Sequence, residues 1–131
     1  MTDPVADLLT RIRNASKAKK NAVDVPASHL KRDVVRILKE QRFIQDVLEL
    51  PDNKQGILRV YLRYNREDEP ILHGLRRLST PGLRRYMDAA QVRRSTFNTR
   101  GVTVISTSSG VMTNFEAAKK GVGGEALLQC W

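Results

Sequence analysis

The chain has 131 residues, of which 40% are hydrophobic, and its 23 lysines and arginines outnumber 14 aspartates and glutamates to give a net charge of +9. This length can bury a core without disulfides, and the single cysteine, Cys130, excludes an intrachain disulfide and is typical of a reducing, cytoplasmic setting. The start MTDPVADLL lacks the basic and apolar regions of a signal peptide, and no apolar run approaches the roughly 20 residues of a membrane span, so we expect neither. The basic balance favours a polyanionic partner over a membrane, with a basic but inert surface as the alternative.

Residues 1–65 predict an α+β module of order α-β-α-β-β. Asp3 and Pro4 are typical of a helix start, and the apolar residues that follow them have helical spacing. Ser28 is a good N-cap for a second helix that runs to about Gln41. Strands are predicted at 23–25, 43–50 and 57–64, the last two joined by the turn sequence PDNKQG.

The polar, acidic stretch NREDEP predicts a boundary, after which residues 66–131 form a second module that is mostly β with one short helix. Pro81–Gly82 suits a type II turn. The short helix opens with the capping box Thr113–Glu116 and ends at Gly121 in a left-handed cap. Strands are predicted over 71–78, with an interruption at Gly74, over 102–106, and over 126–131, where apolar and other residues alternate. A further short helical segment is considered over 88–92.

Arginines dominate the stretch 71–115. It holds seven of them and a single acid, Asp88, so its net charge is +6. A guanidinium presents a planar fork of donors that binds phosphate and stacks on bases, whereas a solvated surface more often mixes lysines with balancing acids. The arginine bias therefore favours a nucleic acid without separating RNA from DNA, although no helix-turn-helix pattern supports a DNA-binding regulator.

Three serines and a threonine form a turn at 106–109, closed by Gly110, and a glycine-rich turn follows at 121–124. A nucleophilic serine needs a base, and the only histidines, His29 and His73, are remote in the sequence. The sequence contains no phosphate-binding Gly-x-x-x-x-Gly-Lys-Ser/Thr motif and no cluster of metal ligands. We therefore expect neither an enzyme nor a site for a cofactor, a metal or a small-molecule substrate. Small hydroxyls beside a glycine backbone suit the sugars, phosphates and base edges of RNA, with an ordinary serine-rich turn as the alternative.

Five stretches of the chain together resemble the bacterial small-subunit ribosomal protein S8 family. They are TDPVADLLTRIRNA, VPASHLKRDVVRILKE, KQGILRVYLRY, GLRRLSTPGLRRY and GVTVISTSSGVMTNFEAAKKGVGGEALLQCW. The stretches occur in the family's order, the resemblance extends over essentially the whole chain, and STSSGVMT with GVGGE is its most specific part. The resemblance implies a fold of two α+β modules, in agreement with the modules predicted from the residues themselves.

The resemblance also implies a primary ribosomal RNA-binding protein that holds the central domain of small-subunit RNA and helps to assemble the platform. It implies contacts with neighbouring small-subunit proteins, chiefly the fifth and also the twelfth, and repression of its own operon messenger as an additional role. Matching motifs imply an RNA-binding set in each module. In the second module the set is Ser106, Thr107, Ser108, Gly110, Tyr86, Gly123, Gly124 and Glu125, with Arg84 and Arg85 as phosphate contacts. In the first module the set is Thr2, Asp3, Arg13 and Asn14.

The chain departs from the family pattern at the edge of this site. The family usually has a lysine where Ser109 stands, and DREARK where this chain has NFEAAK. The segment AAQVRRSTFNTRGV instead gains Arg93, Arg94 and Arg100. We interpret these changes as relocated phosphate contacts around a retained serine loop.

Overall fold

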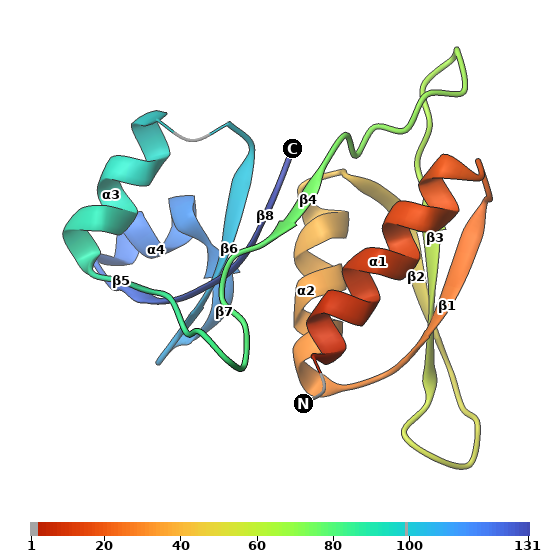
Figure 1. The fold of residues 1–131 in the computed structure, drawn as a ribbon, viewed down its shortest axis with the longest axis horizontal. Coiled ribbons are helices and arrows are strands. Elements are labelled where there is room, and N and C mark those ends of the chain that lie inside the picture. Colours follow the sequence, from red (N-terminus) through yellow and green to blue (C-terminus); the bar gives the residue numbers. More distant parts are fainter. Residues whose placement is uncertain (1–2, 99) are drawn as a thin grey trace. The chain divides into compact units, whose positions relative to one another are not determined.

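A computed structural model describes residues 3–98 and 100–131 of the chain. These residues form two compact units, one of residues 4–73 and one of residues 74–131 together with Asp3. Within the described residues the chain has four helices and two antiparallel sheets (Figure 1). The predicted α+β class is therefore confirmed.

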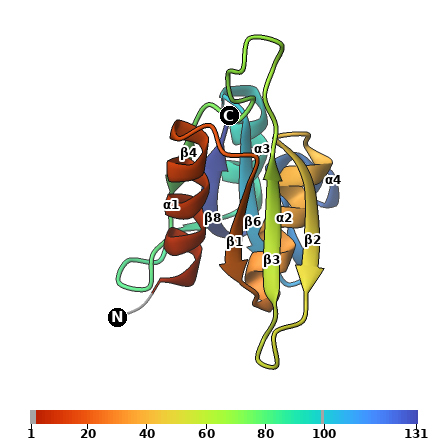
Figure 2. The ribbon, with the colours of Figure 1, turned by 90° about the vertical axis from the view of Figure 1, so that its right-hand side faces the viewer.

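The unit of residues 4–73 contains the predicted order α-β-α-β-β. Its elements are α1 (Pro4–Lys17), β1 (Ala22–Pro26), α2 (His29–Glu40), β2 (Ile44–Leu50) and β3 (Ile57–Leu62). The three strands form an antiparallel sheet in the order β1-β3-β2, and Figure 2 looks onto this sheet with α2 behind it. Ser28 caps α2 as predicted, because its hydroxyl accepts a hydrogen bond from the Lys31 backbone nitrogen at 3.2 Å.

The unit that begins at Gly74 contains seven elements. They are β4 (Leu75–Arg77), β5 (Tyr86–Met87), α3 (Ala89–Asn98), β6 (Val102–Thr107), β7 (Gly110–Thr113), α4 (Asn114–Lys120) and β8 (Gly124–Cys130). Strands β4 and β5 both pair with one edge of β8. The other edge of β8 pairs with β6, and β6 pairs with β7. All of these pairings are antiparallel. Helix α4 begins and ends as predicted, since Thr113 accepts from the Glu116 backbone nitrogen and Gly121 adopts a φ of 67°.

Two helices, α3 and α4, cover one face of this second sheet. Their side chains Val92 and Ala117 are buried with Ile105 of β6 and Met112 of β7 in one core cluster. Helix α3 has ten residues, twice the length of the predicted stretch 88–92, and Asp88 and Gln91 cap its start reciprocally. The Asp88 nitrogen donates to Gln91 Oε1 at 2.9 Å, and the Gln91 nitrogen donates to Asp88 Oδ1 at 2.8 Å. The prediction of a single helix in this module was therefore wrong.

Three further predictions for this unit need correction. The strand expected over 71–78 is reduced to β4, because residues 71–73 belong to the other unit, where the Ile71 nitrogen donates to the Arg63 carbonyl oxygen at 2.9 Å. Gly74 and Trp131 exchange backbone hydrogen bonds of 3.1 Å beside β4, and a Cβ on Gly74 would lie 2.2 Å from the indole. The turn at Pro81–Gly82 is present, but Gly82 has no positive φ, so the turn is not type II. Strand β7, which follows the serine turn directly, was not predicted at all.

The alternation expected for the last strand is interrupted at Leu127. The register shifts between Val104 and Ile105 of β6, so that Leu127 has no direct partner there. Its carbonyl oxygen instead accepts hydrogen bonds from the Leu78 nitrogen at 3.0 Å and from Arg77 Nη1 at 2.7 Å. The bulge lets β8 keep its pairing with β6 on both sides of Leu127.

Candidate nucleic-acid interface

A row of side chains crosses four strands of the second sheet. The strand register places Val111 of β7 opposite Ser106 of β6, Ser106 opposite Glu125 of β8, and Glu125 opposite Tyr86 of β5. Directly opposite residues point to the same face of a sheet, about 4.8 Å apart from one strand to the next. Because the next residue along β6, Ile105, points into the helix-covered core, this row lies on the other face. We refer to Ser106, Glu125 and Tyr86 as the Ser106 row.

The hairpin between β6 and β7 extends from this row. Thr107 pairs with Gly110, which leaves Ser108 and Ser109 as a two-residue exposed loop. The Thr107 hydroxyl donates to the Gly110 carbonyl oxygen at 2.8 Å and accepts from the Ser109 nitrogen at 3.1 Å. Gly110 has a φ of 114°, a conformation that side-chain-bearing residues rarely adopt. Thr107 and Gly110 therefore hold the shape of the loop.

The hydroxyls of Ser106 and Ser108 differ from that of Thr107. Among the described residues, neither has a side-chain hydrogen bond, and Ser108 is exposed. A hydroxyl both donates and accepts, so each can meet a phosphate, a ribose hydroxyl or a base edge. The structure thus separates the predicted serine-threonine set into two available hydroxyls and one that is used inside the loop.

Glu125, at the centre of the row, is tied to the segment that precedes Tyr86. Its Oε2 accepts a short hydrogen bond from the Ser79 hydroxyl and one of 3.0 Å from Arg84 Nη1. The Ser79 oxygen in turn accepts from the Arg85 backbone nitrogen at 3.1 Å. Burial alone would raise the pKa of Glu125, but these hydrogen bonds and the charges of Arg84 and Arg77 outweigh it and lower the pKa below its ordinary value. The ionised carboxylate therefore positions Arg84 and Arg85.

Two glycines allow the strands of the site to approach one another. A Cβ on Gly123 would lie 2.3 Å from the Met87 carbonyl oxygen, and a Cβ on Gly124 would lie 2.1 Å from the Ser106 carbonyl oxygen. Neither distance is compatible with a side chain, so any larger residue would displace β5 or β6. The glycine turn thus has a packing role at the point where it meets the Ser106 row.

The row ends in an exposed aromatic side chain, and two arginines directly precede it in the sequence. The Tyr86 side chain is 69% exposed, and Arg84 and Arg85 are exposed as well. Residues 74–131 carry nine lysines and arginines against three acids, a net charge of +6. Among the described residues only two of these cations, Arg77 and Arg84, form ion pairs. The unit therefore carries largely uncompensated positive charge, and Arg85, which precedes the exposed ring of Tyr86, contributes to it.

Of the predicted site residues near the N-terminus, only Asp3 is described in the same unit as the Ser106 row. Asp3 pairs with Arg77, with Oδ2 3.2 Å from Nε, and both side chains are mostly buried. Thr2 lies outside the described residues. Arg13 and Asn14 are exposed on α1 and belong to the other unit.

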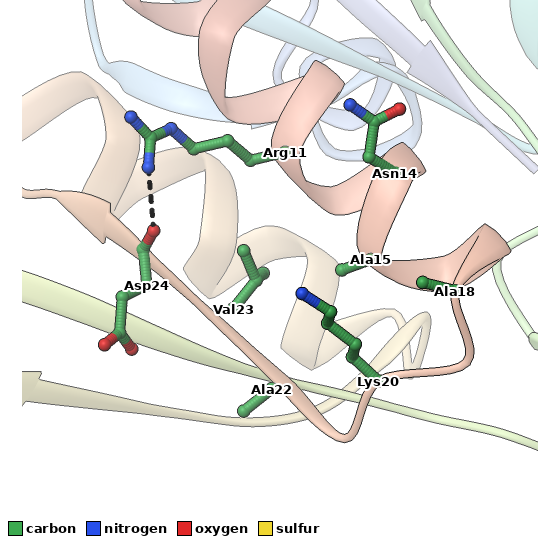
Figure 3. Close-up of a pocket in the computed structure, with 8 residues that line it drawn as sticks. All are labelled: Arg11, Asn14, Ala15, Ala18, Lys20, Ala22, Val23 and Asp24. Carbon is green, nitrogen blue, oxygen red and sulfur yellow. Dashed lines mark hydrogen bonds between the residues drawn. The ribbon is translucent and has the colours of Figure 1, made fainter.

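Asn14 lines an open hollow of about 510 Å³ between α1 and β1 (Figure 3). Arg11 borders the same hollow and donates to the Asp24 carbonyl oxygen at 3.2 Å, and Lys20 also borders it. The hollow therefore combines an amide and two cationic groups with the acid Asp24, and Arg11 also pairs with Asp7 at 3.0 Å, so its lining is polar and of mixed charge.

Catalytic and metal chemistry has no support in the part of the chain that the structure describes. No group of three His, Cys, Asp or Glu residues could hold a metal ion there. Cys130 is fully buried, and burial raises the pKa of its thiol to about 12, so it is not a nucleophile near neutral pH. None of the helices described is long and apolar enough to cross a membrane.

The model of the family described as ribosomal protein S8 matches residues 3–131. The chain belongs to the ribosomal protein S8 family. It is 49% identical to the small ribosomal subunit protein uS8 of Ligilactobacillus salivarius, and 48% identical to the proteins of that name from Geobacillus kaustophilus and Enterococcus faecalis. Each match covers 100% of this chain and 98% of the relative.

Membership of the S8 family confirms that the chain is a ribosomal protein and not an enzyme. Sequence reasoning nevertheless missed Ser79, which connects Glu125 to Arg85 across the site. Its signal was weak, because Ser79 and Glu125 lie 46 positions apart and are brought together by the pairing of β4 and β5 with β8. The capping box formed by Asp88 and Gln91 at the start of α3 could have been predicted from the spacing of the two residues, but was missed.

Proposed function

We propose that the chain is a structural constituent of the small ribosomal subunit in the cytoplasm that binds the central domain of small-subunit ribosomal RNA through the Ser106 row and the hairpin loop at Ser108. The observation that carries the proposal is the alignment of Ser106, Glu125 and Tyr86 across neighbouring strands. Membership of the S8 family supports the ribosomal setting, and the strand pairing that aligns these residues supports the choice of surface.

In this proposal, different side chains of the surface contact the bases, the sugars and the phosphates of the RNA. Ser106 and Ser108 hydrogen-bond to base edges or ribose hydroxyls, which are accessible where an RNA is irregular. Tyr86 stacks on a sugar or an unpaired base. Arg84 and Arg85 contact phosphates and set the register of the complex without reading its sequence. Glu125 acts through Ser79 and Arg84, because its carboxylate holds them in place.

Family resemblance supports three finer roles. Thr2, Asp3, Arg13 and Asn14 would add a second set of RNA contacts from the N-terminal region. The neighbouring small-subunit proteins would be the fifth and the twelfth, and binding would help to organise the platform. The same RNA-binding surface would also accept the chain's own operon messenger and repress its translation.

A titration against three nucleic acids tests the proposal. The protein is titrated with the irregular hairpin of central-domain RNA, a regular RNA duplex and a DNA duplex, each at several salt concentrations. Specific binding predicts a clear preference for the irregular hairpin that persists when salt is raised, since hydrogen bonds to bases are less salt-dependent than phosphate contacts. Equal affinity for all three nucleic acids would contradict the proposal and leave only a basic surface.

A further inference from the structure

The outer face of α3 is a second place where the described chain exposes arginine and aromatic side chains together. Phe97 is 82% exposed, more than any other large hydrophobic side chain described. Arg93 lies four residues and Arg94 three residues before it in the same helix. Residues at these spacings are neighbours on a helix surface. We call Arg93, Arg94 and Phe97 the α3 face.

The α3 face points away from the Ser106 row. The opposite side of α3 carries Val92, which is fully buried with Ile105 and Met112 on the helix-covered side of the sheet. The Ser106 row lies on the other side of the same sheet. A helix about 10 Å in diameter and the sheet itself therefore separate the two surfaces, and one short hairpin seated on the row does not reach α3.

The positive charge of the α3 face is not balanced by the protein. Arg93 and Arg94 form no ion pair or side-chain hydrogen bond with any described residue. The nearest acid in the sequence, Asp88, is used at the helix start, where it accepts from the Gln91 nitrogen. In the other unit, by contrast, Arg59 is paired with an acid, Asp24, at 2.8 Å.

This combination fits one class of partner. Two guanidinium groups without acids bind a polyanion, and an exposed ring between them offers a stacking platform for a flat group. An unpaired nucleic-acid segment presents both a charged backbone and exposed bases. A protein partner would instead have to bring acids to two neighbouring arginines and an apolar pocket to Phe97.

We propose that the α3 face binds an unpaired segment of RNA, with Phe97 stacking on a base and Arg93 and Arg94 contacting phosphates. This inference rests on the proposed function, because it assigns a second segment of the same ribosomal RNA to a surface that the Ser106 row does not share. It also explains why these arginines and an exposed phenylalanine occur together on one side of α3.

The experiment compares two RNA probes, a transcript of the whole central domain and its short irregular hairpin alone. The variants are Phe97→Leu, Phe97→Tyr, Arg93→Ala and Arg94→Ala. Arg66→Ala is the matched control, since Arg66 is exposed, has no described ion-pair partner and lies in the other unit. Unchanged fluorescence of Trp131, the only tryptophan, verifies that the second unit of each variant is folded.

We expect Phe97→Leu to weaken binding of the long transcript by about 5- to 100-fold, the range for loss of one base–aromatic stack. Phe97→Tyr keeps the ring and should bind like the parent. Arg93→Ala and Arg94→Ala should each lower the salt slope for the long transcript by about one. Binding of the short hairpin should not change in any of these variants.

Three results would overturn the inference. If Phe97→Leu binds both RNAs like the parent, the α3 face does not contact RNA, and the proposed function stands alone. If it weakens both RNAs equally, the face does not bind a separate segment. If it binds both RNAs normally but is lost from reconstituted small subunits, the partner of the face is a protein. Should the parent itself bind neither RNA better than a regular duplex, the proposed function fails and this inference with it.

Discussion

Replacing Gly124 by alanine tests the packing on which the candidate interface depends. The added Cβ would lie 2.1 Å from the carbonyl oxygen of Ser106, which is 1.3 Å short of the 3.4 Å at which ordinary contact begins. That oxygen is part of the backbone of β6 and cannot rotate away, so β6 and β8 must move apart at the pair that carries Ser106 and Glu125.

Overpacking of this kind typically costs about 1–3 kcal/mol of unfolding free energy. For a chain of this length the cost corresponds to a fall in Tm of roughly 4–12 °C. The same displacement moves Ser106 relative to Tyr86, so affinity for the irregular RNA hairpin should also fall at temperatures where the variant is still folded.

The assay is thermal unfolding followed by the fluorescence of Trp131, whose ring packs on Gly74 in the same unit. Gly82→Ala is the control, because a Cβ there meets nothing within 4 Å and the residue has no positive φ. An unchanged Tm for Gly124→Ala, or an equal loss for Gly82→Ala, would refute the close approach of β6 and β8 as the reason for a glycine at this position.

Two predictions concern pH. Because the pKa of Glu125 is lowered by folding, its ionised carboxylate stabilises the fold above the ordinary pKa of 4.5, and this stabilisation is lost as the pH falls through the lower folded pKa. A Glu125→Gln variant should therefore be less stable than the parent at pH 7 and equally stable in strong acid, as measured by urea denaturation. A stability gap that does not close in acid would contradict the carboxylate's role. The thiol of Cys130 has a pKa raised from 9.0 to about 12, so its contribution is complete below pH 9 and is lost as the pH rises toward 12. Iodoacetamide at pH 8 should therefore alkylate Cys130 only when the protein is unfolded in urea, with alkylation measured by mass spectrometry. Rapid alkylation of the native protein would show that the last strand is not buried as described.

The parts of the fold that follow from neighbouring residues could be predicted from the sequence. Ser28, Thr113 and Gly121 each cap a helix through hydrogen bonds or dihedral angles set within a few positions, and all three predictions are confirmed. The parts that depend on distant pairing could not. The need for a glycine at position 74 is one example, since it depends on the indole of Trp131, which lies 57 positions later in the chain and is brought there by the pairing of β4 with β8.

The candidate site divides in the same way. The serine turn and the arginines near it could be recognised as a pattern in the sequence. Which hydroxyls are hydrogen-bonded within the loop could not, because the Thr107 hydroxyl donates to the Gly110 carbonyl oxygen only once β7 forms and pairs Gly110 with Thr107. The role of Glu125 was likewise hidden, since Ser79 and Arg84 reach it from the segment between β4 and β5. The RNA-binding assignments themselves stay predictions.

The most direct test of the central claim compares Ser108→Ala with Ser109→Ala. The two residues are adjacent in the same exposed loop. Ser109 contributes to the loop through its backbone nitrogen, which donates to the Thr107 hydroxyl, and no RNA contact is predicted for the Ser109 hydroxyl. Removing one hydrogen bond from a buried interface costs about 1–2 kcal/mol, so Ser108→Ala should reduce the preference for the irregular RNA hairpin over a regular RNA duplex by roughly 5- to 30-fold. Ser109→Ala should leave that preference unchanged. If both variants keep the parent's preference, or both lose it equally, the loop does not read RNA through the hydroxyl of Ser108.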